Sequence, residues 1–458
     1  MKPNDEFIVK IEKTVNEGKG ITRIDGFPVF VENAAPRDVL KVKLSKINKT
    51  YANAEIIDVI EASPHRIKPL CPMHNVCGSC NWQHIEYSEQ LRQKRQIVYE
   101  TLKNITGKDF NVNETIASPK RNGYRCKVQY PVSQKKSGRL ISGYYKKLSH
   151  DLINVKYCPM HDFIINEIME FIKNEAPNFK ITGYIETKHS GLLRHVIFRK
   201  SSFNGQLLII LVINDDKIDT KLKKLADLLM SKFPEITGVC VNFNTMKSNV
   251  ILGKITKVIK GNDYYIEILS GIKYKISASS FFQVNPYSAE IIFNTVKNLI
   301  SERISTPSIL DAYSGVSSFG IWLSSIASKV VSVEEVYSAS SDAVQNLKIN
   351  NLDNIEIIND DTAKTFKNFI NNNIKFDVVL IDPPRKGSSA EALKSVISLA
   401  EKFLIYVSCN PATLARDLKF LIEHNFLPEY IQPVDMFPNT SHIETVVLLK
   451  NYNKKDAV

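Results

Sequence analysis

Two residues near the carboxyl end of the sequence could make and break covalent bonds. Cys409 lies in the segment Tyr406–Pro411, directly after an apolar run, and Glu444 lies in the segment Phe437–Thr445, beside a final hydrophobic strand. A thiol and a carboxylate that converge on one pocket indicate a nucleophile and a base. Each residue alone also has a plainer interpretation, since Cys409 would fit as a small buried residue and Glu444 as a solvated acid.

An earlier segment could cradle a nucleotide. Leu310–Gly320 follows an apolar run and opens a helix, and Gly315 and Gly320 let its backbone turn sharply and approach a ligand. Glu334 follows the next predicted strand, about 20 residues further on, where an acid can accept hydrogen bonds from both ribose hydroxyls. An ordinary strand-to-helix turn has the same pattern. The segment does not separate a nicotinamide dinucleotide from S-adenosylmethionine.

Four cysteines have the spacing of ligands in one sulfur site. Cys71, Cys77 and Cys80 lie on one predicted loop, and Cys158 follows in a distant segment. Thiolates suit zinc or an iron–sulfur cluster, and three neighbouring ligands with a remote fourth favour the cluster over zinc. Cysteines that bind nothing and simply fill the core are the remaining alternative.

The positive charge is concentrated in one stretch of the sequence. The formal net charge is +12, and residues 91–150 contain 14 Lys and Arg against 3 Asp and Glu. Such a stretch is typical of proteins with a polyanionic partner, because each neutralised phosphate releases condensed counterions. Lysines on solvated faces are the alternative, since the whole sequence is rich in lysine. The distribution favours a nucleic acid as the partner.

Length and composition exclude several classes of protein. The 458 residues, 43% hydrophobic and 24% charged, fit a globular chain of about three domains. The longest apolar run, Leu207–Ile213, is too short to cross a bilayer, which takes about 20 residues. The start of the sequence lacks the apolar stretch of a secretory signal. We therefore expect a cytoplasmic protein with no membrane segment.

Three regions differ in the elements that they predict. Residues 7–60 read as short strands separated by turns, the pattern of a small all-β barrel, and residues 124–260 read as mixed strands and helices. From about residue 277, helices alternate with buried strands, which predicts a parallel sheet with helices on both faces. Ligands of such sheets bind at the carboxyl ends of the strands. The segment Ile381–Gly387, where two prolines end an apolar strand, has this position.

The individual elements are predicted as follows. Strands are expected at residues 7–11, 18–20, 28–31, 39–44, 52–60, 207–213, 308–312, 330–333, 355–358, 378–381 and 403–407. Helices are expected at residues 87–102, 221–232, 288–300 and 319–327.

Together these motifs resemble the RNA uracil-5-methyltransferases that use S-adenosylmethionine, in the branch with an N-terminal TRAM domain and a 4Fe–4S cluster. The likeness covers nearly the whole sequence. Besides the segments above, it rests on Gly18–Ile21, Asp25–Val31, Cys77–His84, Leu193–His195, Phe281–Pro286 and Asp382–Arg385.

The resemblance implies a multidomain fold. Residues 1–60 would form a TRAM domain, a small OB-like β-barrel that binds RNA. Residues 61–270 would form a central α+β iron–sulfur domain, with part of 90–122 packed on the catalytic domain. Residues 271–458 would form a Rossmann-like α/β methyltransferase domain. We expect this protein to act as a monomer.

The resemblance also implies the activity, which is methylation of uridine C5 in RNA through a covalent adduct between Cys409 and uracil C6. Glu444 would then remove the C5 proton as the base. The expected substrate is 23S rRNA, with tRNA as the alternative, and the sequence does not indicate which uridine is modified.

Two further alternatives differ in chemistry. One is a methyltransferase that acts on an exocyclic amine, against which Arg385 and Cys409 argue. The other is a non-catalytic RNA-binding iron–sulfur sensor, against which the presence of both Cys409 and Glu444 argues.

The resemblance further implies two sets of ligand-binding residues. S-adenosylmethionine would be contacted by Gln283, Tyr313, Glu334 and Asp382, with either Asp360 or Asp361 facing the adenine. The 4Fe–4S cluster would be held by Cys71, Cys77, Cys80 and Cys158.

Overall fold

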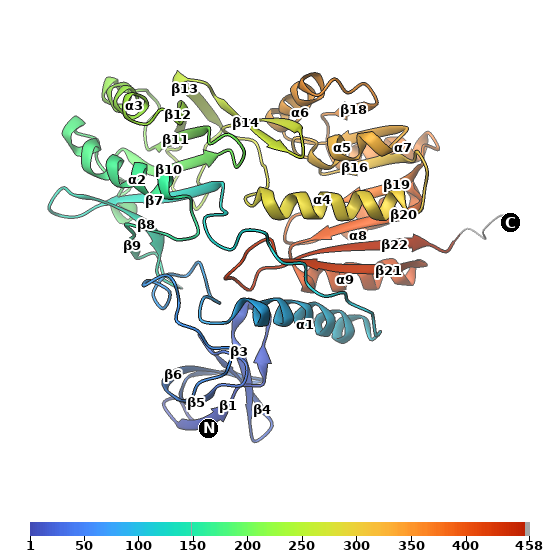
Figure 1. The fold of residues 1–458 in the computed structure, drawn as a ribbon, viewed down its shortest axis with the longest axis horizontal. Helices are drawn as coiled ribbons and strands as arrows, with labels where there is room; N and C mark the ends of the chain where they lie inside the picture. The colour runs from blue at the N-terminus through green and yellow to red at the C-terminus, as the bar shows by residue number, and fades with distance from the viewer. Residues whose placement is uncertain (148, 454–458) are drawn as a thin grey trace. The chain divides into compact units, whose positions relative to one another are not determined.

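The computed structural model describes residues 1–147 and 149–453, so the end of the expected methyltransferase domain, 454–458, lies outside the described residues. The chain forms two compact units (Figure 1). The first unit consists of Met1–Pro119, Pro383–Leu393 and Tyr406–Val458, and the second of Lys120–Asp382 and Lys394–Ile405. No helix of the described residues has the length and apolarity needed to span a membrane.

The first unit begins with a six-stranded sheet in the order β1-β5-β6-β4-β3-β2. Its strands are β1 (Glu6–Lys10), β2 (Lys13–Thr14), β3 (Gly20–Ile24), β4 (Phe27–Val31), β5 (Val39–Ile47) and β6 (Ala52–Glu61). Alternate residues of β5, such as Leu40 and Val42, are fully buried in its core. Asp25 and Gly26 both have positive φ and form the two-residue turn between β3 and β4.

One strand predicted in this region is wrong. Residues 16–18 form a short 3₁₀ helix, η1 (Asn16–Gly18), and the strand starts only at Gly20. Glu17 and Gly18 both have positive φ, at 68° and 83°, which a β-strand does not allow. The other predicted barrel strands are confirmed, with small shifts at their ends.

The rest of the first unit packs two helices together with a strand pair. Helix α1 (Tyr87–Thr106) lies against α9 (Pro411–Glu423), as Figure 1 shows. Strands β21 (Phe426–Val434) and β22 (Glu444–Asn451) pair antiparallel. The expectation of a parallel sheet is therefore wrong for this pair of strands. The connection between these strands is too short for the crossover of a dozen or more residues that a parallel pair requires.

The second unit contains a seven-stranded sheet in the order β13-β12-β11-β10-β7-β8-β9. Its strands are β7 (Lys127–Gln134), β8 (Leu140–Tyr145), β9 (Leu152–Asn154), β10 (Leu193–Lys200), β11 (Leu207–Ile213), β12 (Ile236–Phe243) and β13 (Ile255–Gly261). Helices α2 (Phe163–Glu175) and α3 (Thr220–Lys232) contribute to the same apolar core as this sheet. Every residue of β11 is buried, as expected of a central strand.

The second unit also contains the predicted parallel strands. Strands β18 (Ile355–Ile358), β17 (Lys329–Val333), β16 (Ser308–Ala312) and β19 (Phe376–Ile381) pair in parallel in this order. The remaining elements here are β14 (Tyr264–Leu269), β15 (Ile272–Ser277), α4 (Pro286–Ser301), α5 (Ser318–Leu323), α6 (Tyr337–Ile349) and α7 (Thr362–Asn371). Helix α8 (Ala390–Leu399) and strand β20 (Ala400–Ser408) each begin in one unit and end in the other.

Candidate active site

Cys409 lines a pocket of about 280 Å³ in the first unit. Four segments that are far apart in the sequence form its walls: Asn16 and Glu17, then Arg385, then Cys409–Pro411, then Ser441–Ile443. Cys409 itself is partly exposed. The pocket therefore offers a reachable thiol surrounded mainly by polar and charged groups.

Cys409 lies at the junction of β20 and α9. Asn410 caps the helix, since its side-chain oxygen accepts a hydrogen bond from the Ala412 amide at 3.1 Å, and Pro411 occupies the first turn. The thiol thus lies beside the amino end of a 13-residue helix. The amino end of a helix carries a partial positive charge, and the thiolate is the nucleophilic form of cysteine.

The turn that carries Arg385 is fixed on the same helix. The side chains of Asn410 and Thr413 donate to the Arg385 carbonyl at 3.2 and 3.3 Å. Gly387 has a φ of 74°, and a Cβ atom there would lie 2.5 Å from Arg416 Nη2. Only glycine fits this position, so the sequence Pro-Pro-Arg-Lys-Gly forms a tight turn that presents Arg385 to the pocket.

Asn81 joins the barrel to the wall that contains Ser441. Its side-chain nitrogen donates to the Glu17 carbonyl at 2.9 Å and to Ser441 Oγ at 3.0 Å, and its oxygen accepts from the Ser441 amide at 2.9 Å. Trp82, the next residue, donates through its indole nitrogen to the Gly18 carbonyl at 3.0 Å. Sequence reasoning missed this contact, although the Gly18–Ile21 and Cys77–His84 motifs both pointed to the segments that it joins.

A fully buried ion pair supports the segment that leads to Ser441. Lys94 of α1 donates to Asp435 at 2.5 Å and to the Phe437 carbonyl at 3.2 Å, and both side chains of the pair are completely buried. The Phe437 amide donates to the same carboxylate at 3.1 Å. Burial lowers the pKa of Lys94, while the charge of Asp435 opposes this shift. Sequence reasoning also missed this pair.

Glu444 is the first residue of β22 and is buried. It directly follows Ile443, which lines the Cys409 pocket, and it pairs with Val434 in the β21–β22 register. The structure therefore brings the peptide that carries Glu444 to the edge of the pocket that contains Cys409.

In the second unit, the loop between β16 and α5 is fixed by two acids. Glu334 accepts hydrogen bonds from the Gly315 amide and the Val336 amide, both at 2.8 Å. Asp311 is buried and accepts from the Gly320 amide at 2.9 Å. A Cβ atom on Gly320 would lie 2.4 Å from the hydroxyls of Ser317 and Ser332, so the helix begins against the sheet with no room for a side chain.

This loop keeps buried polar atoms that have no partner among the described residues, namely Asp311 Oδ1 and Ser314 Oγ. Burial raises the pKa of Asp311 to about 7, and the nearby charges of Asp382 and Glu334 add to this shift. Burial also raises the pKa of Asp382 to about 7. A loop with unsatisfied polar atoms and with carboxyl groups whose pKa is near 7 fits a polar cofactor better than a closed structural turn.

The other predicted cofactor residues lie around this loop or before α4. Tyr313 begins the loop with a φ of 62°, and burial followed by the charge of Asp361 raises its pKa. Asp361 caps α7, whereas Asp360 forms an ion pair with Lys364 at 2.8 Å. Of the two acids, Asp361 is therefore the one whose charge raises the pKa of Tyr313. Gln283 is partly buried in the segment before α4.

Cys71, Cys77 and Cys80 lie on a compact loop of the first unit. The Cys71 amide donates to Gln83 at 2.9 Å, and the Cys77 amide donates to the Met73 carbonyl at 2.8 Å. Burial raises the pKa of Cys71, and the charge of Cys77 adds to this shift. Among residues 1–147 and 149–453, however, no three side chains of the metal-ligating types are gathered as a metal site.

Cys158 belongs to the second unit, where its amide donates to the side chain of Asn166 at 2.8 Å. The expected distinct iron–sulfur domain is thus not seen as a separate unit of the chain. The donor chemistry of the loop still fits a sulfur-ligated group, since three thiols occupy one short segment.

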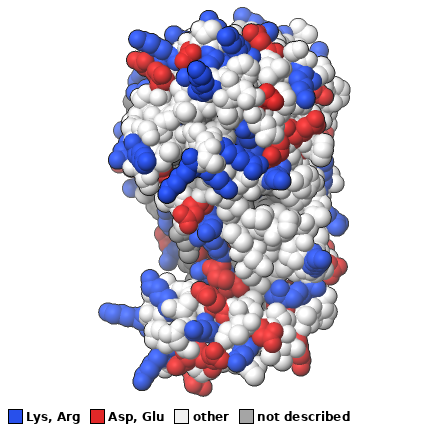
Figure 2. Space-filling view, turned by 90° about the vertical axis from the view of Figure 1, so that its left-hand side faces the viewer, with Lys and Arg blue, Asp and Glu red and all other residues white. Residues whose placement is uncertain are grey.

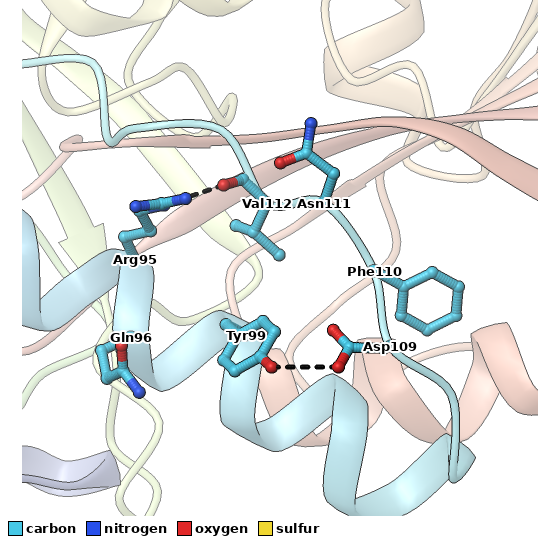
Figure 3. Close-up of a pocket in the computed structure, with 7 residues that line it drawn as sticks. All are labelled: Arg95, Gln96, Tyr99, Asp109, Phe110, Asn111 and Val112. Carbon is cyan, nitrogen blue, oxygen red and sulfur yellow. Dashed lines mark hydrogen bonds between the residues drawn. The ribbon is translucent and has the colours of Figure 1, made fainter.

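A second cavity of the first unit, of about 470 Å³, lies between α1 and residues 109–112 (Figure 3). Arg95 donates to the Val112 carbonyl at 2.8 Å, and the Tyr99 hydroxyl donates to Asp109 at 3.2 Å. In Figure 3 the Phe110 ring points away from Tyr99. Both charged groups of this cavity, Arg95 and Asp109, thus already have hydrogen-bond partners, and we assign no chemistry to it.

Comparison with known families gives two matches. The profile of the tRNA (uracil-5-)-methyltransferase family matches residues 86–452, and that of the TRAM domain matches residues 2–57, where the six-stranded barrel lies. An uncharacterized RNA methyltransferase of Clostridium acetobutylicum is 37% identical over 460 residues, which cover 99% of both chains. One from Clostridium tetani is 36% identical over 458 residues, which cover 99% of this chain and 98% of the relative.

A solved structure is also similar along nearly the whole chain. It is the tRNA (uracil-54, C5)-methyltransferase of Pyrococcus abyssi in complex with S-adenosyl-L-homocysteine. The TM-score is 0.76 at 26% sequence identity, and the match covers 97% of this chain and 100% of the other. The expected TRAM barrel and Rossmann-like methyltransferase fold are thereby confirmed.

Proposed function

The chain belongs to the tRNA (uracil-5-)-methyltransferase family, and from this premise we propose that it methylates uridine C5 through a transient covalent bond to Cys409. The observation that carries the proposal is the placement of Cys409 in a pocket whose rim continues into Glu444. An RNA substrate and S-adenosylmethionine as the methyl donor follow from the family.

Cys409 would begin the reaction. Uracil C5 is a weak nucleophile, and addition of the Cys409 thiolate to C6 forms an S–C6 bond and moves the ring electrons toward C5 and the O4 oxygen. The amino end of α9 supports the thiolate before addition. S-adenosylmethionine, when bound, supplies an electrophilic methyl group for the activated C5.

Glu444 would complete the reaction as the base. After methylation C5 carries both the methyl group and its original proton. The Glu444 carboxylate would accept this proton, the C–H electrons would restore the C5–C6 double bond, and the thiolate of Cys409 would leave. Arg385 is exposed at the rim of the same pocket and offers a cation for the uracil carbonyl oxygens or a flanking phosphate.

The residues of the second unit would hold the methyl donor. Glu334 and Asp382 are the acids at the ends of β17 and β19, the position at which parallel sheets bind nucleotides. We propose that they act with Gln283 and Tyr313, and that Asp361 rather than Asp360 faces the adenine, since Asp361 is the acid whose charge reaches Tyr313.

We propose 23S rRNA as the substrate, on the basis of the TRAM barrel and the cysteine loop. The tRNA alternative is favoured by one observation, the likeness to the Pyrococcus abyssi enzyme, which acts on tRNA. Mapping 5-methyluridine in rRNA and tRNA from cells that lack the gene decides between them. A missing methyl group in 23S rRNA supports the first substrate, and a missing one in tRNA supports the second. If neither RNA has lost a methyl group, the proposed activity is contradicted.

A 4Fe–4S cluster on Cys71, Cys77, Cys80 and Cys158 is part of the proposal. Its ligands would come from two distant segments of the sequence, and no step of the methylation requires it, because uracil methylation transfers no electron. Anaerobically purified protein should contain iron and acid-labile sulfide, and Cys77→Ser should lose both. Zinc found in place of the iron would instead identify a zinc site.

We also propose that the protein acts as a cytoplasmic monomer with domain boundaries near residues 60 and 270. Light scattering during size-exclusion chromatography measures the first point, and limited proteolysis followed by mass spectrometry measures the second.

A further inference from the structure

The Leu193–His195 motif takes no part in the chemistry described above. It lies at the start of β10, and Arg194 and His195 line a cavity of about 500 Å³ in the second unit. Pockets for small organic groups have volumes of roughly 300–1,000 Å³. The walls come from β7, β8 and the segments around residues 184–187 and 248–251.

Arg194 is a buried cation in the lining of this cavity. The residue is only 5% exposed, and its Nη1 atom donates to the carbonyls of Asn244 and Met246 at 2.7 and 2.8 Å. Its guanidinium lies 4.5 Å from the centre of the Tyr184 ring. Its Nε atom is buried and has no hydrogen-bond partner among the described residues. A buried charged group with an unused donor is costly unless a ligand completes it.

His195 adds a second unused polar atom. Burial, followed by the charge of Arg194, lowers the pKa of His195 to about 4, so the ring is neutral at pH 7. Its Nδ1 atom is buried and has no partner among the described residues. A neutral imidazole nitrogen can donate or accept a hydrogen bond according to its tautomer. The cavity thus keeps directional polar atoms rather than a cluster of cations.

Aromatic rings also line the cavity. Tyr145, the last residue of β8, is 38% exposed, and its ring centre lies 5.9 Å from that of His150. Such a partly exposed ring offers a flat face on which a base can stack. The hydroxyls of Ser133 and Ser149 and the amide of Asn249 supply further hydrogen-bonding groups around it.

The surroundings of the cavity are basic. From Thr115 to His150 the sequence contains nine Lys and Arg and no Asp or Glu. Lys135, Lys136 and Arg139, which surround the turn between β7 and β8, are exposed. Figure 2 shows Lys and Arg side chains gathered on this face of the second unit. The lining also contains the acids Asp151 and Glu186, which lie within ion-pair distance of Lys146 and His150, respectively. Cations outside the cavity and aromatic and hydrogen-bonding groups inside it fit an unpaired nucleotide whose base enters and whose phosphates stay at the surface.

We propose that this cavity binds one unpaired base of the RNA substrate, separate from the uridine that is methylated, with the base stacked on Tyr145 and its edge directed toward Arg194 and His195. The inference rests on RNA being the substrate. It gives the Leu193–His195 motif a recognition role, and it makes the second unit a reader of the nucleotides around the target.

The test measures RNA binding by fluorescence anisotropy. Two fluorescein-labelled RNAs are used, a single-stranded oligouridylate and RNA from cells that lack the gene. Stacking of one base on an aromatic side chain contributes about 1–3 kcal/mol, so Tyr145→Ala should raise Kd by about 5- to 150-fold. Tyr145→Phe keeps the ring and should restore binding. Phe203→Ala, which removes an aromatic ring that is 66% exposed in the same unit, is the matched control and should leave Kd unchanged.

Salt dependence separates stacking from phosphate contacts. Lys135→Ala should reduce the slope of log Kd against log salt by about one, whereas Tyr145→Ala should leave this slope unchanged. In the methylation assay Tyr145→Ala should raise KM for RNA and leave kcat unchanged. Ultraviolet crosslinking should attach RNA to the peptide that contains Tyr145.

The proposal is overturned if Tyr145→Ala binds both RNAs like the wild-type protein, or if it alters the salt slope as Lys135→Ala does. Binding and crosslinking require no methyl transfer, so they decide on the cavity even if the proposed methylation fails. Conversely, methylation with an unchanged KM in Tyr145→Ala supports the proposed function and removes only the cavity from it.

Discussion

The pocket around Cys409 is built from four segments of the first unit that are far apart in the sequence, whereas the loop after β16 is one continuous strand–loop–helix segment of the second unit. Asn81 and the Lys94–Asp435 pair hold the pocket together through long-range contacts. The loop is held by Asp311 and Glu334, which bind backbone amides within 20 residues. Substitutions of residues far from Cys409 in the sequence should therefore damage the pocket and leave the loop intact.

The largest effect is expected from Cys409→Ala. Without the thiol no covalent bond to C6 forms, and methyl transfer should fall by about a thousandfold or more. Binding of S-adenosylhomocysteine, measured by isothermal titration calorimetry, should stay within about twofold of wild type. Cys240→Ala removes a thiol from the core of the second unit and serves as the control. Substantial methylation by Cys409→Ala would refute its role.

Lys94→Met should have the next largest effect. It removes one of the contacts that hold the Cys409 pocket together and none that hold the loop after β16. It leaves Asp435 as an unpaired buried charge, so the free energy of unfolding from urea titration should fall by about 3–5 kcal/mol. The double variant Lys94→Met/Asp435→Asn removes that charge and keeps an acceptor for the Phe437 amide, so it should regain much of the loss. Equal stability of the single and double variants would show that the charge is not the cause.

Asp311→Asn tests the loop. Burial raises the pKa of this carboxyl to about 7, whereas an unfolded Asp has a pKa of about 3.9. The native state therefore keeps a proton that the unfolded chain releases, and stability contributed at low pH is lost as the pH rises from about 4 to about 7. Between these limits the wild-type protein should lose up to about 4 kcal/mol relative to Asp311→Asn. Parallel pH profiles of thermal unfolding would contradict this assignment.

Asn81→Ala should have the smallest effect of the four, again on the pocket. It removes three hydrogen bonds that join Glu17 to Ser441. Misplacement of a pocket wall by a fraction of an ångström to one ångström lowers kcat/KM by about 10- to 100-fold. Asn75→Ala, an exposed asparagine on the same cysteine loop, is the matched control. If both variants keep full activity, the pocket does not depend on this contact.

The same contrast explains what could be predicted from sequence. The strand Ser308–Ala312, the glycines of the loop and the acid at residue 334 lie within one local pattern, so the amino-acid sequence alone is enough to recognise the loop. Cys409 and Glu444 are likewise marked by their own motifs. Sequence patterns describe neighbours along the chain, and these features involve only such neighbours.

The contacts that assemble the pocket could not be predicted in this way. Asn81 and Ser441 are 360 residues apart, and Lys94 and Asp435 are 341 residues apart. A lysine on a polar helix normally predicts a solvated side chain, so nothing local marks Lys94 as buried. The strand predicted at residues 18–20 is wrong because Glu17 and Gly18 have positive φ. Asn81 and Trp82, from a distant segment, donate hydrogen bonds to the carbonyls of this turn.

The central claim is that Cys409 bonds to the uracil ring and that Glu444 is needed only to release it. The most direct measurement is a denaturing gel and peptide mass analysis of Glu444→Gln after incubation with unmodified RNA and S-adenosylmethionine. We predict an adduct that survives denaturation, carries a methylated uridine on Cys409, and is absent from Glu444→Gln/Cys409→Ala. Loss of methylation by Glu444→Gln without any adduct would contradict the account.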